Sequence, residues 1–141
     1  MAAMYVIKWN GGVVASKMFI IKLVCSSTSE AEYVALSEGC KRLRQLSMFC
    51  EELCFKQGGN PVYCDSEAAL AIARDGGASR GKHIDIRFHF VKDHVKWGYV
   101  DLRGVASDDN IADMGTKLQP LPLFEKHRAM CGLVDISGEL Q

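Results

Sequence analysis

The sequence predicts a mixed α/β domain in which helices cover a mixed β-sheet. Three observations predict this class. An Asn-Gly turn separates two apolar β-prone segments near the start, long amphipathic segments follow, and two further β-prone segments alternate with them. A hairpin followed by alternating strands and helices is typical of a mixed sheet flanked by helices. The 141 residues suit one domain, so we expect a single domain over residues 1–141.

The first half of the chain predicts a hairpin and one long helix. Residues 4–9 and 13–15 flank Asn10-Gly11, which suits the positive φ of a tight hairpin turn, and a further β-prone run covers residues 18–24. After Ser27-Thr28-Ser29, apolar residues recur at helical spacing up to Cys54. Gly58-Gly59 and Pro61 end this helix.

The second half predicts two strands and four shorter helices. Residues 62–64 form a short buried strand, and Ser66 caps a helix over residues 67–74. The spacing of Ile84, Phe88, Val91 and Val95 predicts the next helix, which ends at Gly98. A strand over residues 99–105, a short helix from 107 or 108 to 112 and a last helix up to residue 131, capped by Gly132, complete the order.

Composition and charge exclude several classes of protein. Apolar residues make up 48% and charged residues 24%, which are ordinary globular values. Lys+Arg and Asp+Glu both number 17, so any binding of nucleic acid must use a local basic patch. No apolar run reaches the roughly 18 residues of a membrane span, and the first residues lack the features of a signal peptide.

The six cysteines include no Cys-x-x-Cys pair and mostly fall within apolar patterns. We expect buried, reduced thiols in an intracellular protein, cytoplasmic or nuclear. The alternative is a metal half-site at Cys50 and Cys54, which lie one helical turn apart, although no second pair has zinc-like spacing.

Three carboxylates stand at positions that suit a metal site. Asp65 follows the strand over residues 62–64, Glu32 lies in the first turn of the long helix, and Asp113 lies near the short helix after the last strand. Carboxylates gathered at one sheet end repel one another, and shared divalent cations relieve that repulsion. Two Mg²⁺ ions there would activate water and stabilise the leaving oxygen of a phosphodiester.

Each carboxylate also has a purely structural interpretation. Glu32 completes a capping box with Ser29, Asp65 is a turn residue before Ser66, and Asp113 is a solvated helix residue. Spacing alone favours the structural interpretation for Glu32 and Asp113 and divides evenly for Asp65.

A basic stretch between residues 79 and 96 is the candidate patch for nucleic acid. Its candidate phosphate contacts are Arg80, Lys82, Arg87 and Lys92. The alternative is an ordinary solvated helix face, with Arg87 and Lys92 pointing into water. His83, His89 and His94 lack i, i+4 spacing, so a histidine metal cluster is disfavoured.

Several blocks of the sequence together resemble the ribonuclease H domain of copia-type retrotransposon Pol polyproteins. They are STSEAEYVAL (27–36), VYCDSEAA (62–69), SRGKHIDIRFHFV (79–91), DNIADMGTK (109–117) and FEK (124–126). The resemblance implies a ribonuclease H-like fold and Mg²⁺-dependent (or Mn²⁺-dependent) hydrolysis of the RNA strand in an RNA–DNA hybrid. It also implies that Glu32, Asp65 and Asp113 are catalytic and bind the metal.

One departure from the family is important. The family fold begins with a central strand that carries the first catalytic aspartate, whereas here no aspartate precedes Asp65. We therefore expect a sheet that lacks the first central strand, and weak or absent activity. Unpaired neighbouring strands favour compensation by a partner strand, a domain swap or a rearranged sheet. Residues 18–21 are apolar where the family is polar, so we expect a self-association surface there.

Three hypotheses follow for the function. The chain is a weak or inactive retrotransposon ribonuclease H, or a co-opted non-catalytic module that binds nucleic acid or protein. The third hypothesis is an active enzyme completed by a neighbouring chain. The expected partners are an RNA–DNA hybrid or other nucleic acid and a homodimer mate or partner strand that completes the sheet, with no membrane.

Overall fold

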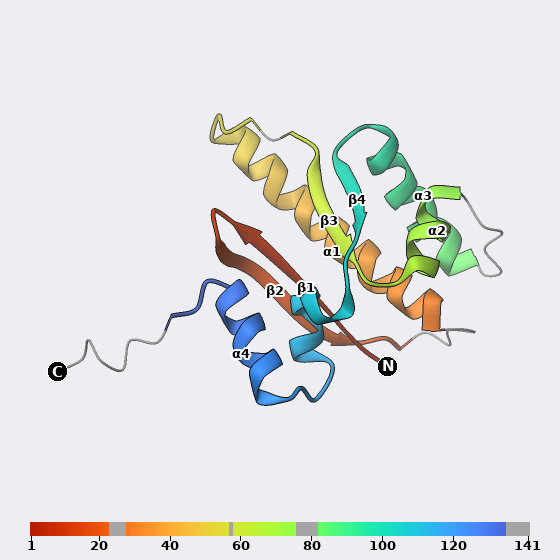
Figure 1. The fold of residues 1–141 in the computed structure, drawn as a ribbon. Coiled ribbons are helices and arrows are strands. Elements are labelled where there is room, and N and C mark those ends of the chain that lie inside the picture. The colour runs from red at the N-terminus through yellow and green to blue at the C-terminus, as the bar shows by residue number, and fades with distance from the viewer. Residues whose placement is uncertain (23–27, 57, 76–81, 135–141) are drawn as a thin grey trace.

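The computed structural model describes residues 1–22, 28–56, 58–75 and 82–134, and its elements confirm the mixed α/β class (Figure 1). In chain order they are β1 (Ala2–Trp9), β2 (Gly12–Ile20), α1 (Thr28–Glu52), β3 (Asn60–Cys64), α2 (Glu67–Asp75), α3 (Lys82–Lys96), β4 (Val100–Gly104), the 3₁₀ helices η1 (Ser107–Asp109) and η2 (Ile111–Gly115), and α4 (Leu121–Met130). The predicted short helix after β4 is thus two 3₁₀ turns.

Strands β1 and β2 form the predicted antiparallel hairpin. Asn10 and Gly11 take φ values of 50° and 86°, as a tight turn with two left-handed residues requires. β2 is continuous from Gly12 to Ile20, so the prediction of separate segments over residues 13–15 and 18–24 is wrong. The polar residues between them stay in the strand because β1 pairs with β2 along its whole length, with Tyr5 opposite Lys17.

The apolar residues 18–21 do not form one exposed patch. Met18 and Ile20 are 62% and 72% exposed, whereas Phe19 and Ile21 pack toward Val34 of α1. This alternation follows from the two-residue period of a strand, which sends successive side chains to opposite faces. The expected self-association surface is therefore reduced to Met18 and Ile20.

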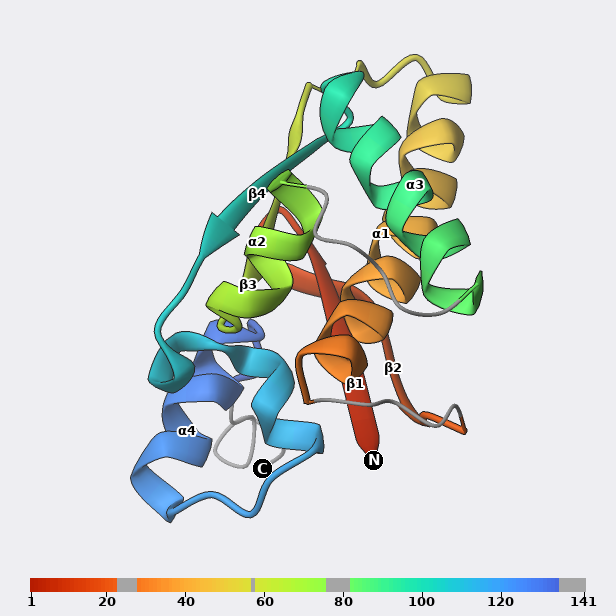
Figure 2. The same ribbon diagram turned by 90° about the vertical axis from the view of Figure 1, so that its right-hand side faces the viewer.

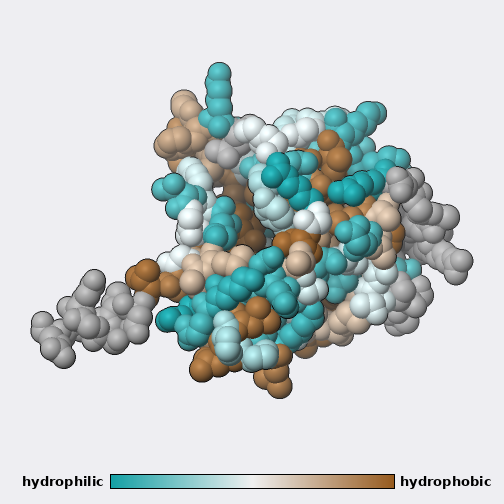
Figure 3. All heavy atoms as spheres, viewed as in Figure 1, coloured by the Kyte–Doolittle hydropathy of each residue, from teal (hydrophilic) through white to brown (hydrophobic). Residues whose placement is uncertain are grey.

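Strands β3 and β4 are parallel and form a second sheet, with Asn60 opposite Val100 and Cys64 opposite Gly104. Within the described residues the expected single sheet is thus divided into two sheets of two strands. Among the residues that the structure describes, β1 and β3 each pair on one side only, and both border a groove of about 530 Å³. The space-filling view shows this hollow with apolar residues at its floor (Figure 3). α1 contributes Ala35, Leu36 and Leu43 to the lining.

The main core lies between the β3–β4 pair and three helices. Figure 2 shows α1, α2 and α3 grouped on one side of that pair, with α4 apart from them beside η2. Tyr33 of α1 is fully buried, and its hydroxyl donates to the backbone oxygen of Phe88 in α3 at 3.2 Å. The core residues of the second half are those with the predicted helical and strand spacing, among them Leu70, Phe88, Val91 and Leu102.

The described cysteines are free thiols, and four of the five are buried: Cys40, Cys50, Cys64 and Cys131. Cys54 is exposed just beyond α1 with a φ of 65°, where the helix has already ended. No described helix is long and apolar enough to cross a membrane.

Candidate functional site

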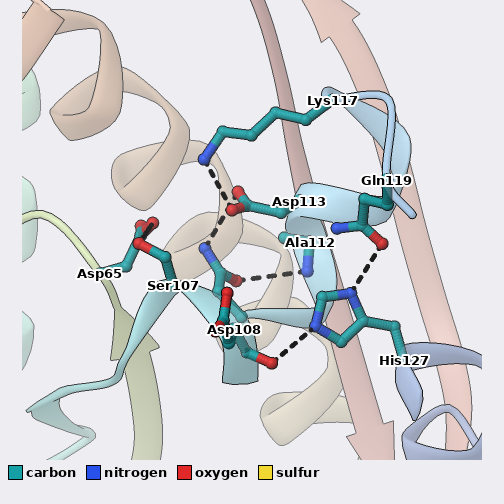
Figure 4. Close-up of polar contacts among 9 residues, drawn as sticks. Asp65, Ser107, Asp108, Ala112, Asp113, Lys117, Gln119 and His127 are labelled. Carbon is teal, nitrogen blue, oxygen red and sulfur yellow. Dashed lines mark hydrogen bonds and ion pairs between the residues drawn. The ribbon is translucent and has the colours of Figure 1, made fainter. Parts of the chain in front are cut away.

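Asp65 follows β3 directly, at the carboxyl end of the parallel strand pair, as predicted. Ser107 begins η1 just after β4, and its Oγ donates to Oδ2 of Asp65 at 3.2 Å (Figure 4). Because two neighbouring parallel strands end here, the segments that follow them meet at one sheet edge. Asp65 also lies in the turn before α2, so its structural interpretation and its site interpretation are compatible.

Asp113 lies in η2 and is only 9% exposed, so its interpretation as a solvated helix residue is wrong. Two donors hold its carboxylate (Figure 4): Lys117 Nζ lies 2.6 Å from Oδ2, and Asn110 Nδ2 lies 3.4 Å from Oδ1. Asn110 caps η2, because its Oδ1 accepts from the backbone N–H of Ala112 at 3.2 Å. The cap therefore fixes the short helix that carries Asp113.

Glu32 lines two cavities, each shared with one of the other two carboxylates. α1 already begins at Thr28, so Ser29 is inside the helix and the capping-box interpretation of Glu32 is wrong. Glu32 borders the groove together with Asp65, and it borders a second cavity of about 290 Å³ together with Asp113. Burial and the charges of Asp65 and Asp113 raise the pKa of Glu32, and the Lys117 ammonium opposes this rise.

The structure thus brings the three predicted carboxylates into electrostatic contact from three separate elements. Within the described part of the chain, however, no three His, Cys, Asp or Glu side chains are arranged to hold a metal ion. The oxygen donors and their mutual repulsion fit a hard divalent cation. The three carboxylates are thus suitable ligands by their chemistry, but they are not close enough together to hold one ion in this structure. The Cys50 and Cys54 alternative has no third ligand among these residues either.

Sequence reasoning missed Lys117, Ser107 and Asn110. The signal for Lys117 was its position four residues after Asp113, a spacing that brings side chains together on a helical turn. All three carboxylates stabilise its charged form. The hydrogen bond to Asp113 and the charges of Asp113, Asp65 and Glu32 raise the pKa of Lys117.

The basic stretch is only partly available for phosphate contacts. Arg87 was expected to face solvent, but its Nε lies 3.8 Å from Oε1 of Glu38 in α1, and its side chain is 24% exposed. α3 packs against α1 and buries this part of its basic face. Lys92 is exposed as expected, with its Nζ 5.4 Å from the centre of the Phe88 ring. Arg80 and the side chain of Lys82 lie outside the described residues.

Comparison with known proteins indicates the origin of the chain. Over 130 residues (92% of the chain) it is 33% identical to the retrovirus-related Pol polyprotein from transposon TNT 1-94 of Nicotiana tabacum. Over 118 residues (82% of the chain) it is 29% identical to the transposon Ty1-JR2 and Ty1-MR1 Gag-Pol polyproteins of Saccharomyces cerevisiae. The chain spans only 10% of the first relative and 7% of the other two. No family model matches it, and no solved structure matches it either. The relatives support a retrotransposon origin in a Pol polyprotein region.

Proposed function

We propose that this retrotransposon-derived chain is a ribonuclease H-like domain whose site acts on the RNA strand of an RNA–DNA hybrid. The observation that carries the proposal is that Glu32 shares one cavity with Asp65 and a second with Asp113, and that its pKa is raised by the charges of both. The three residues come from blocks that resemble the ribonuclease H domain of copia-type elements. Their order in the chain and their three separate supporting elements agree with that resemblance.

Mg²⁺ or Mn²⁺ is the cofactor that these ligands suit, and a bound cation would supply an activated water and stabilise charge on the leaving oxygen. The roles of the chain's own residues follow from their surroundings. Asp113 is carried by η2, and its carboxylate accepts hydrogen bonds from Lys117 and Asn110. Glu32 is influenced by the charges of both other carboxylates, and Ser107 orients Asp65 by a hydrogen bond. Lys92 offers an exposed ammonium for a backbone phosphate of the hybrid.

The site we propose contains three carboxylates, because no aspartate precedes Asp65 in this sequence. The family resemblance implies a fourth, so we expect the chain by itself to cleave the hybrid weakly. A cation would be held less firmly by three ligands, and Mn²⁺ binds a given site more tightly than the hard, geometry-demanding Mg²⁺. We therefore expect any cleavage to be faster in Mn²⁺.

The test is cleavage of a labelled RNA–DNA hybrid in Mg²⁺ and in Mn²⁺ by the parent chain and two variants. Asp65→Asn removes a ligand charge, and Asp101→Asn is its control, since Asp101 is exposed and pairs with Arg103 on β4. We expect Asp65→Asn to abolish cleavage and Asp101→Asn to keep the parental rate. A parent without cleavage in either metal, or equal cleavage by both variants, contradicts the proposed activity.

The groove between β1 and β3 favours a second candidate function, a non-catalytic module that accepts a partner strand. Both bordering strands have one edge that no other described strand pairs with, and an unpaired edge is a template for another strand. The partner would be a second copy of the chain, which would complete the sheet by donating an extended segment. The apolar lining from α1 would cover one face of such a strand.

Mass in solution tests this second candidate. Ala35 borders the groove, so Ala35→Trp would fill it, whereas Ala68 is exposed on α2 and Ala68→Trp serves as the matched control. We expect a parental dimer that Ala35→Trp converts to monomers and Ala68→Trp leaves intact. A parent that stays monomeric as its concentration rises contradicts assembly through the groove.

A further inference from the structure

Lys117 is held against the carboxylate cluster by the backbone as well as by its side chain. The backbone N–H of Lys117 donates to the backbone carbonyl oxygen of Asp113 at 3.0 Å, so a helical turn places the two residues side by side. The side chain then extends along the site, and its Nζ lies 2.6 Å from Oδ2 of Asp113 (Figure 4). This contact is a short charge-assisted hydrogen bond.

Asp113 has a particular need for this cation. It is the only buried carboxylate among the described residues, and an ionised carboxylate away from water is stable only when it is paired. Its other donor, Asn110 Nδ2, is neutral and stands 3.4 Å away. The Lys117 ammonium therefore supplies the positive charge that the cluster otherwise lacks.

The ammonium engages one of the carboxylate oxygens that a bound cation would use as a ligand. Oδ2 of Asp113 is engaged by Lys117, and both residues border the same cavity of about 290 Å³ with Glu32. The Lys117 side chain is 57% exposed, so it can swing into water without crossing packed residues. The ammonium can thus leave Oδ2 without unfolding the turn that carries it.

We propose that Lys117 is a tethered counter-ion of the carboxylate cluster, and that a divalent cation must displace its ammonium from Asp113 in order to bind. This inference rests on the proposed metal-binding role of the cluster. It makes Lys117 a positioning residue, which keeps Asp113 ordered in the metal-free chain and lowers the apparent affinity for the metal. Removal of the positive charge therefore strengthens metal binding, although it weakens the metal-free fold.

The expected effect on affinity is a three- to tenfold decrease in the apparent Kd for Mn²⁺, of the order that one partly exposed ion pair contributes. The probe is Mn²⁺ alone, titrated into the full chain by calorimetry, with the rise in melting temperature as a second readout. Lys117→Gln removes the charge, and Lys117→Arg keeps it. Lys126→Gln is the control, since Lys126 forms an equally short ion pair (2.6 Å) with the exposed Asp109.

We expect tighter Mn²⁺ binding by Lys117→Gln, parental binding by Lys117→Arg and by Lys126→Gln, and a lower melting temperature of Lys117→Gln in chelator. A merely structural role would lower that melting temperature without changing the Kd, which would overturn the inference. Weaker Mn²⁺ binding by Lys117→Gln would also overturn it. Binding by Lys117→Gln alone would support it strongly. If neither the parent nor any variant binds Mn²⁺, both the proposed metal site and the inference about Lys117 are wrong.

Discussion

His127 connects three segments beside the candidate site, and its replacement by alanine tests whether that connection is structural. The side chain is fully buried in α4. Its Nε2 donates to the backbone oxygen of Asp108 in η1 at 3.1 Å, and its Nδ1 lies 3.0 Å from Oε1 of Gln119 (Figure 4). His127 thus ties α4 to the segments on both sides of η2.

The magnitude follows from these contacts. Truncation of a large buried side chain to alanine costs about 2–5 kcal/mol, and each buried polar group left unpaired adds about 1–3 kcal/mol. Partial relaxation and access of water reduce the sum, so we expect a loss of about 3–5 kcal/mol for His127→Ala. A chain of 141 residues has an unfolding entropy of about 0.3 kcal/mol/K, so the melting temperature should fall by about 10–17 °C.

The assay is thermal unfolding followed by circular dichroism in metal-free buffer. His127→Phe keeps most of the side-chain volume but removes the polar contacts of both ring nitrogens. We therefore expect its melting temperature to lie between that of the parent and that of His127→Ala. His89→Ala is the control, because His89 is exposed on α3. If His127→Ala unfolds within about 2 °C of His89→Ala, the connecting role of His127 is refuted.

Three further predictions concern backbone, charge and thiols. Gly132 and Gly98 both have positive φ (78° and 74°), but a Cβ on Gly132 would lie 2.6 Å from a backbone oxygen of the hairpin turn, whereas Gly98 has open space. We expect Gly98→Ala to lower the free energy of unfolding by about 1 kcal/mol. Gly132→Ala should lower it by clearly more, and urea unfolding of both variants measures the difference. The pKa of Glu32 is raised above 4.5, so its ionised form destabilises the metal-free fold as pH rises. Glu32→Gln should therefore be more stable than the parent at pH 7, with the gain vanishing below pH 4.5; equal stability at pH 7 contradicts this. Burial raises the pKa of Cys40 to about 12, so peptide mapping after brief alkylation at pH 8 should find Cys54 modified and Cys40 intact.

The sequence predicted elements well where one side of a helix or strand must be apolar. α1 and α2 appear within a residue or two of their expected bounds, because their apolar spacing matches the faces that pack in the core. Arg87 shows the limit of this reasoning. Periodicity assigned it to the polar face of α3, but α1 lies against part of that face and supplies Glu38 as its ion-pair partner. The neighbour that covers a polar face is a tertiary feature, which local periodicity does not contain.

The candidate site shows the same division between local and tertiary information. The position of Asp65 after a strand was sufficient to predict its place at the sheet end. Asp113 was misjudged from spacing, since its burial depends on the packing of η2 against β1. That packing is close enough that a Cβ on Gly115 would lie 2.1 Å from Sδ of Met4. Lys117 was missed because a lysine near a carboxylate is common on surfaces, and only the burial of Asp113 makes this pair distinctive.

The two sheets and the carboxylate cluster are mechanically connected. Asp65 directly follows β3, whereas η2, which contains Asp113 and is followed by Lys117, packs on β1. The spacing of the two aspartates is therefore set by the width of the groove that separates β1 from β3. A strand that filled the groove and paired with both edges would fix that width. Among the described residues the ligands have no metal-holding arrangement with the groove open, so we expect a fixed width to favour one. Assembly through the groove and metal binding should consequently strengthen each other, because linkage between two binding events is reciprocal. On this argument the apparent Kd for Mn²⁺ decreases as the chain dimerises. A Kd that is independent of chain concentration across the dimerisation range would show that dimerisation and metal binding are not coupled.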